Sequence, residues 1–134
     1  MPTTAEIDPL ARSAALAIAW ARIGIGVGTF GFTRPALAKL GFERPDATTV
    51  TLARLAGGRD IALGIHALSA AADRDRLREA TLLGALVDIG DAVAFGAAAI
   101  RHPEGRGAAV QNAALGAAAA VGGALVLARL SRSS

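Results

Sequence analysis

Seven ionisable side chains interrupt stretches of this sequence that are otherwise apolar. Ionisable residues inside such stretches are rare and indicate a functional site by default. Arginine and aspartate at matching depth can form ion pairs, and a layer of such residues can hold a polar head group or relay protons. The candidate polar cluster consists of Arg22, Arg54, Arg59, Asp60, His66, Asp88 and Asp91.

Four windows of mostly apolar residues carry these side chains. They cover residues 13–32, 48–72, 80–100 and 108–130, and about 20 helical residues suffice to span the hydrocarbon core of a bilayer. The links contain proline, glycine or dense charge and are short, so that neighbouring helices run antiparallel. We predict a short interfacial helix over residues 36–40 in the first link. We predict an all-α fold, an antiparallel four-helix transmembrane bundle that forms one domain over residues 1–134.

The composition excludes several classes of protein. Hydrophobic residues make up 53% of the chain and charged residues only 19%, which is typical neither of a disordered chain nor of an ordinary soluble domain. Outside the polar cluster, most basic residues lie in short links, and they form no basic face with interleaved aromatics, so nucleic acid is not an expected partner. We predict a multi-pass protein of the plasma membrane. Lysine and arginine number six against five in favour of the side that holds both termini, which predicts cytoplasmic termini.

The second window cannot insert alone. Two arginines and an aspartate near the bilayer centre raise the free energy of insertion by about 7–10 kcal/mol. The seven large aliphatic residues of the window lower it by only about 2–4 kcal/mol. Either neighbouring helices neutralise these charges or the segment is not a span. Apart from Arg129 at the end of the fourth, the four windows hold three arginines and three aspartates. Folding the links as hairpins places Arg59 level with Asp91, and it places Arg22 near Gly57 in the same layer.

The fourth window differs from the other three because it has no ionisable residue between positions 108 and 128. It offers the polar cluster only packing and two early amides, Gln111 and Asn112. Small residues at three- and four-residue spacing favour close helix contact over lipid contact, and they predict a homo-oligomer or membrane-partner interface through Ala113, Gly116, Ala120 and Gly123. We further expect Trp20, the only tryptophan, to pack within the apolar face of the first helix.

Part of the sequence resembles known membrane proteins. The stretch Arg54-Leu-Ala-Gly-Gly-Arg-Asp-Ile-Ala-Leu-Gly64, followed by Leu86-Val-Asp-Ile-Gly-Asp91, resembles a family of small four-helix bacterial membrane proteins of unknown function. The stretch Arg22-Ile-Gly-Ile-Gly, which leads to Leu37-Ala-Lys-Leu-Gly41, is similar to the opening of DoxX-like four-helix proteins. The resemblance implies a four-helix membrane fold and no established reaction. DoxX relatives have been linked to quinol or redox systems.

Metal and cofactor chemistry find little support in the sequence. Asp88 and Asp91 could hold Mg²⁺ facing a diphosphate, but two carboxylates are too few without further ligands, and arginine partners fit them better. His66 has no second histidine or cysteine beside it, because His102 lies in a link and the chain has no cysteine. Residues 26–31 match a dinucleotide pattern but lack the strand that the pattern requires. We therefore expect no metal and no cofactor.

Three functions remain open from the sequence. The polar cluster could bind a small lipophilic or amphiphilic molecule, with its pocket walls supplied by the first three helices. Alternatively, the ion pairs only hold the helices in register, and the protein is a structural or accessory subunit of a membrane complex. As a membrane-embedded enzyme or transporter, it would use Asp88 and Asp91 as acid and base and Arg59 as an anchor.

Overall fold

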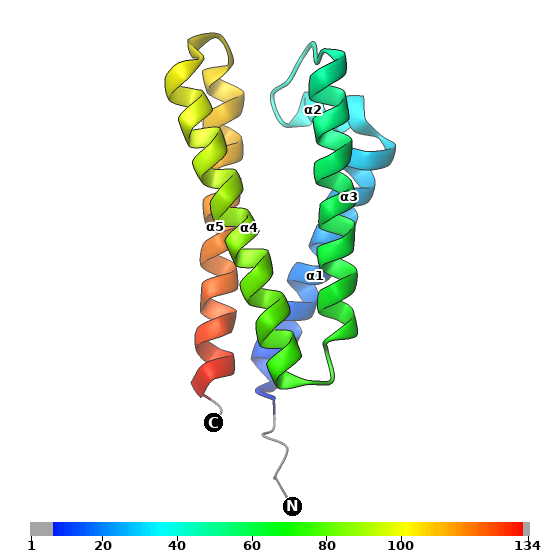
Figure 1. The fold of residues 1–134 in the computed structure, drawn as a ribbon, viewed down its shortest axis with the longest axis vertical. Helices are drawn as coiled ribbons and strands as arrows, with labels where there is room; N and C mark the ends of the chain where they lie inside the picture. The colour runs from blue at the N-terminus through cyan, green and yellow to red at the C-terminus, as the bar shows by residue number, and fades with distance from the viewer. Residues whose placement is uncertain (1–6, 133–134) are drawn as a thin grey trace, which may run out of the picture.

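The computed structural model describes residues 7–132, and within this range the regular secondary structure is entirely helical. This confirms the all-α class. The elements are α1 (Pro9–Gly31), α2 (Thr33–Lys39), α3 (Ala47–Ser69), α4 (Arg74–Arg101), the 3₁₀ turn η1 (Pro103–Gly105) and α5 (Arg106–Arg132) (Figure 1). Each predicted window lies on one of the four long helices. The short helix predicted at residues 36–40 begins three residues earlier, at Thr33.

The long helices form two antiparallel pairs, α1 with α3 and α4 with α5 (Figure 1). Contacts between the two pairs are far fewer than contacts within them. The pairs converge at the end of the molecule that holds the α3–α4 connection and both termini, and they diverge toward the other end. The core therefore lies at the convergent end, in a cluster of small and aliphatic residues: Ala11, Ala15, Ala70, Leu77, Ala80, Val126 and Leu130.

Helix starts and stops follow from local residue chemistry. Asp8, Asp46 and Asp73 cap α1, α3 and α4, each accepting a hydrogen bond from a backbone amide in the first turn, which satisfies a donor without an intrahelical partner. At Asp46 the hydrogen bonds from Thr49 lower the pKa of the carboxyl, so the ionised form that caps the helix persists into acid.

A glycine ends α2 close to the first turns of α5. Gly41 has a φ of 90°, and Phe42 donates its amide to the Leu37 carbonyl at 2.9 Å, an arrangement typical of a glycine-terminated helix. Beside this turn, the Asn112 side chain donates to the Leu40 carbonyl at 3.2 Å. The early amides of α5 thus bind the end of α2 instead of the charged residues.

Three segments in the described range are long and apolar enough to cross a membrane: α1, α4 and Pro103–Arg132, which contains η1 and α5. This indicates a membrane protein. Helix α3 is not among them, so composition supports three of the four predicted spans. The predicted span that composition does not support is α3, the second window. It carries Arg54, Arg59 and Asp60, and these charges are also the reason that it is not expected to insert alone.

Large apolar side chains lie exposed on all four long helices, among them Leu55, Val93 and Val121. Trp20 is 63% exposed, so the expectation that it packs inside the fold is wrong. An apolar helix face in a membrane protein can face lipid as well as a neighbouring helix, and hydropathy does not distinguish the two. The aliphatic surface is that expected of helices in contact with acyl chains.

Candidate functional site

Five of the seven predicted residues form one continuous network across three helices. Helix α1 contributes Arg22, α3 contributes Arg59 and Asp60, and α4 contributes Asp88 and Asp91. We call these five residues the charged layer. The ion pairs run in the order Asp91, Arg59, Asp60, Arg22, Asp88, so each arginine is shared by two carboxylates.

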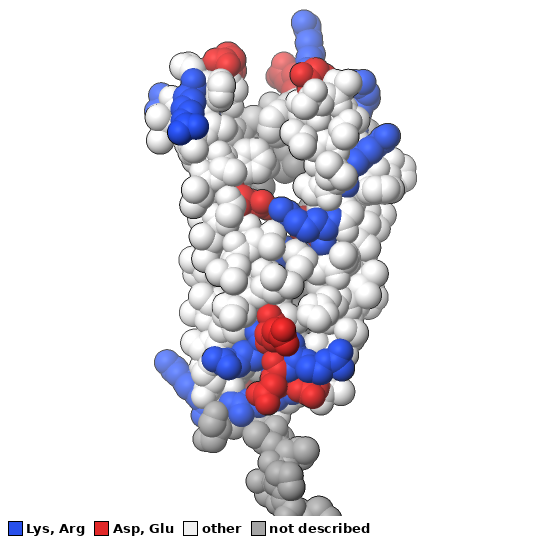
Figure 2. Space-filling view, viewed as in Figure 1, with Lys and Arg blue, Asp and Glu red and all other residues white. Residues whose placement is uncertain are grey.

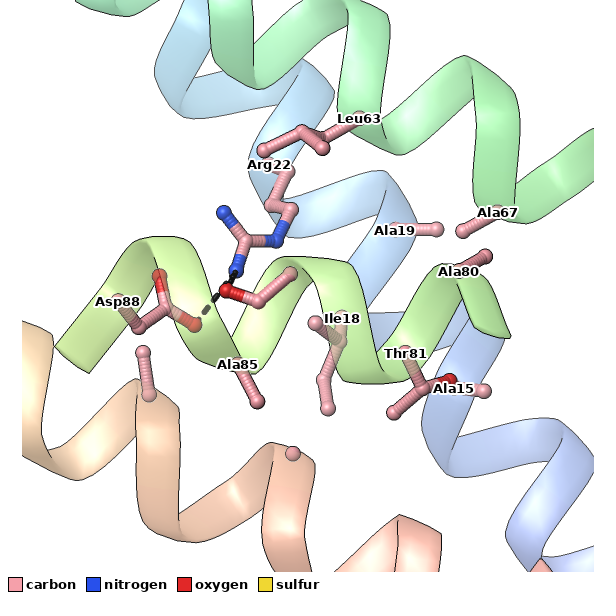
Figure 3. A pocket seen from close by; sticks show the side chains of 13 residues that line it. Ala15, Ile18, Ala19, Arg22, Leu63, Ala67, Ala80, Thr81, Ala85 and Asp88 are labelled. Carbon is pink, nitrogen blue, oxygen red and sulfur yellow. Dashed lines mark hydrogen bonds and ion pairs between the residues drawn. The ribbon is translucent and has the colours of Figure 1, made fainter. Parts of the chain in front are cut away.

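One end of the charged layer is buried. Arg22 Nη2 lies 2.5 Å from Asp88 Oδ2 and donates to the Gly84 carbonyl at 3.0 Å (Figure 3). The two side chains are only 12% and 10% exposed. Gly84 leaves room for this contact, because a Cβ at that position would lie 3.2 Å from Arg22 Nη2. Helix α5 covers Asp88 from the other side, where Gly116 approaches its backbone carbonyl closely.

Asp60 connects the two arginines. Its Oδ1 atom lies 3.4 Å from Arg22 Nη1 and 3.3 Å from Arg59 Nη2. A carboxylate can accept several hydrogen bonds, and this one holds α1 and α3 to a common depth. The spacing of Arg59 and Asp60 as neighbours on α3 lets one helix turn present both charges.

The other end of the charged layer is half-exposed. Arg59 donates to both oxygens of Asp91, from Nη1 at 3.0 Å and from Nη2 at 2.7 Å, in the bidentate geometry that arginine and carboxylate prefer. The side chains are 36% and 35% exposed, about three times the exposure of Arg22 and Asp88. Arg59 Nε is buried and has no hydrogen-bond partner among the described residues.

The half-exposed pair lies at the floor of a hollow. Figure 2 shows blue and red atoms meeting at mid-height on this face, with the surface hollowed above them, and Figure 1 places α3 and α4 on the two sides in the same view. The ion pair of Arg59 and Asp91 joins these two helices. The divergence of the two helix pairs produces this hollow. Charged atoms are otherwise gathered at the two ends of this face.

A separate space lies on the buried side of the charged layer. It is a cavity of about 20 Å³ lined by Arg22, Asp88 and mostly alanine and aliphatic side chains from all four long helices (Figure 3). This volume holds about one water molecule. The cavity is too small for an organic ligand, so the hollow above Arg59 and Asp91 is the better candidate for binding one.

Two predicted residues lie outside the charged layer. Arg54 donates from Nε to the Thr33 hydroxyl at 3.2 Å, and His66 is exposed. Within residues 7–132, no ion pair joins either of them to the charged layer. The expected balance of three positive and three negative charges is therefore wrong: the charged layer has two arginines and three aspartates, a formal charge of −1.

The depth expected for Arg22 is also wrong by one helical turn. Arg22 lies beside Asp60, and Gly57 instead faces Gly26, whose carbonyl would lie 2.8 Å from a Cβ at Gly57. Arg59, in contrast, pairs with Asp91 as expected. Sequence reasoning did not assign Gly84 a role beside Arg22; its position one turn before Asp88 on α4 was the available signal.

The structure also places the small residues of α5. Gly116 and Gly123 approach Ala92 and Ala85 of α4 closely, so they pack within the chain. Contact between α5 and a second copy or another partner stays a prediction and would need another face of the helix. Among the described residues, no group of three histidine, cysteine, aspartate or glutamate side chains is arranged to hold a metal ion.

Comparisons of the chain with protein families, curated proteins and solved structures find no match. The resemblance to DoxX-like proteins stays a prediction.

Proposed function

We propose that this chain is a four-helix integral protein of the plasma membrane that binds a small amphiphilic molecule. The polar head of that molecule contacts Arg59 and Asp91, and its apolar part lies in the hollow between α3 and α4. The observation that carries this proposal is the half-exposed bidentate pair in the middle of a long apolar surface, open to a hollow, in a layer whose other end is buried.

The contrast between the two ends of the charged layer argues against a purely structural role. A pair that only fixes helix register is well served by burial and full hydrogen bonding, as Arg22 and Asp88 are. Arg59 has an additional donor, Nε, that no described residue satisfies, and buried donors are normally paired. A hydroxyl, carbonyl or ether oxygen of a head group would supply an acceptor.

The charged layer also supports α3 as the fourth span. A charge inside the bilayer is tolerated when it faces the interior of the bundle and is paired, and the midpoint of α3 meets both conditions through Arg22 and Asp91. Four spans place both termini on one side, which we propose is the cytoplasm.

Single cysteines test this topology because the chain has none of its own. Glu43→Cys and Gly105→Cys are expected to react with a membrane-impermeant maleimide from one side of the membrane, and Ala72→Cys only from the other. All three positions are exposed. Labelling of Glu43→Cys and Ala72→Cys from the same side, with Gly105→Cys opposite, would show that α3 does not span.

The ligand is tested by extraction. Tagged protein purified from native membranes is expected to carry a small amphiphile, detectable by mass spectrometry of the solvent extract. The charge-neutral double variant Arg59→Leu/Asp91→Leu should lose it, whereas the control Asp75→Asn/Arg76→Gln, which changes two exposed residues at the start of α4, should keep it.

An identical extract from both variants, each folded by circular dichroism, would contradict the binding proposal. In that case the ion pairs serve packing alone, and a structural or accessory role in a membrane complex replaces ligand binding. If the extract contained a substrate together with its reaction product, the result would favour the membrane-enzyme alternative, with Asp88 and Asp91 as acid and base.

A further inference from the structure

The charge of the bound molecule can be inferred from the charged layer, provided that the layer binds an amphiphile as proposed above. We infer that the hollow between α3 and α4 takes a lipophilic monocation, a molecule with one positive charge on or within an apolar framework. Its charge completes the layer at Asp91, and its apolar groups lie between the two helices.

The inference begins with the formal charge of −1. Arg22 and Arg59 face three aspartates, and the closest further arginine on α3, Arg54, is directed to Thr33. From α5 the layer receives no charge, because the ionisable residues of that helix lie at its ends. An unbalanced charge at membrane depth is costly, so the layer has a net affinity for one positive charge.

The accessible part of the layer is the part that a ligand would reach. Arg22 and Asp88 are covered by α1, α4 and α5, whereas Asp91 is 35% exposed beside the hollow. Both Asp91 oxygens accept from Arg59, yet a carboxylate has about four acceptor sites. A cation above the pair is therefore attracted to Asp91 and to the excess charge of the whole layer.

The surroundings fit an apolar framework around that charge. Leu55 precedes Arg59 by one turn on α3, and Phe95 follows Asp91 by one turn on α4, so each shares a helix face with the charged residue. Leu55 is 66% exposed, and Phe95 is half-buried. An aliphatic side chain and an aromatic ring one helical turn from the ion pair suit an organic cation, because the ring face also attracts positive charge.

A pair of probes of equal shape and opposite charge tests the sign. Tetraphenylphosphonium, a monocation, is expected to bind the purified full-length protein in uncharged maltoside detergent, as measured by isothermal titration calorimetry. Tetraphenylborate, the matched anion, should bind at least about tenfold more weakly.

Two substitutions should move the affinity in opposite directions. Asp91→Asn makes the charged layer neutral and should weaken tetraphenylphosphonium binding about tenfold. Arg59→Gln changes the formal charge of the layer from −1 to −2 and should strengthen that binding. The control Asp75→Asn makes the same change in total charge at an exposed site on α4 and should have no effect. A structural role alone would instead weaken binding in both layer variants.

The outcomes separate this inference from the proposed function. Equal or tighter binding of tetraphenylborate, or a shift in the same direction for Asp91→Asn and Arg59→Gln, would overturn the inference of a cation and leave an amphiphile of another charge in the same hollow. Failure of both probes together with an empty solvent extract would overturn the proposed function as well.

Discussion

Replacing Arg22 with leucine is expected to destabilise the folded protein by about 3–5 kcal/mol, the loss typical of removing one partner of a buried pair. The substitution strands Asp88, which is only 10% exposed on its side chain, and it removes one of the two arginines that Asp60 contacts. The Gly84 carbonyl loses its donor as well. The free energy of unfolding can be measured by titrating the protein in mixed micelles with a denaturing detergent.

The double variant Arg22→Leu/Asp88→Leu is expected to be clearly more stable than Arg22→Leu, because it removes both charges from the buried end and leaves Asp60 paired with Arg59. Arg59→Leu should cost distinctly less than Arg22→Leu, since the carboxylate that it strands, Asp91, is 35% exposed, whereas Asp88 is only 10% exposed. A double variant as unstable as the single one, or equal losses at Arg22 and Arg59, would contradict the assignment of a buried and an accessible end.

The sequence was sufficient to predict the partner of Arg59 because the α3–α4 link is short and visibly charged. Asp73 caps α4, and the charged segment of residues 73–79 marks the hairpin turn in the sequence. From its centre at residue 76, Arg59 and Asp91 lie 17 and 15 residues away. Once a hairpin has a fixed turn, the helical rise places charged residues at predictable depth.

The link between α1 and α3 gives no such fixed point. It contains α2 and the turn at Gly41, and the register of α1 against α3 is set by close contacts of Gly26, Gly57 and Gly64. Helix α1 has four glycines and α3 has three, and the sequence does not indicate which of them meet. The prediction for Arg22 therefore missed by one turn, and Arg54 was included in a layer that it does not join.

The hollow could not be predicted from the sequence. It exists because the molecule consists of two helix pairs that converge at one end only, and side-chain patterns along single helices do not encode that divergence. Equal numbers of charges in the windows indicated a neutral layer. Only the three-dimensional arrangement shows that Arg54 binds Thr33 outside the layer and that the Arg59–Asp91 ion pair is accessible.

A single methyl group at Gly57 is expected to disrupt the α1–α3 pair. A Cβ there would lie 2.8 Å from the Gly26 carbonyl oxygen and 2.9 Å from the Phe30 amide nitrogen, and it would also meet the Thr29 hydroxyl. Two of these neighbours are backbone and cannot rotate away, so the helices must separate. Gly57→Ala should cost about 2–3 kcal/mol, measured by the same denaturing-detergent titration.

The adjacent residue provides the matched control. A Cβ at Gly58 would have as its closest neighbours two ring carbons of Phe30, at 3.9 Å, an ordinary contact, so Gly58→Ala should be neutral or stabilise by up to about 1 kcal/mol through helix propensity. Separation of α1 from α3 in Gly57→Ala also draws Arg22 away from Asp60. That variant should therefore lose tetraphenylphosphonium affinity while Gly58→Ala keeps it. Equal stability of the two variants would show that α1 and α3 do not pack through Gly57, and the depth assigned to Arg22 would fall with that contact.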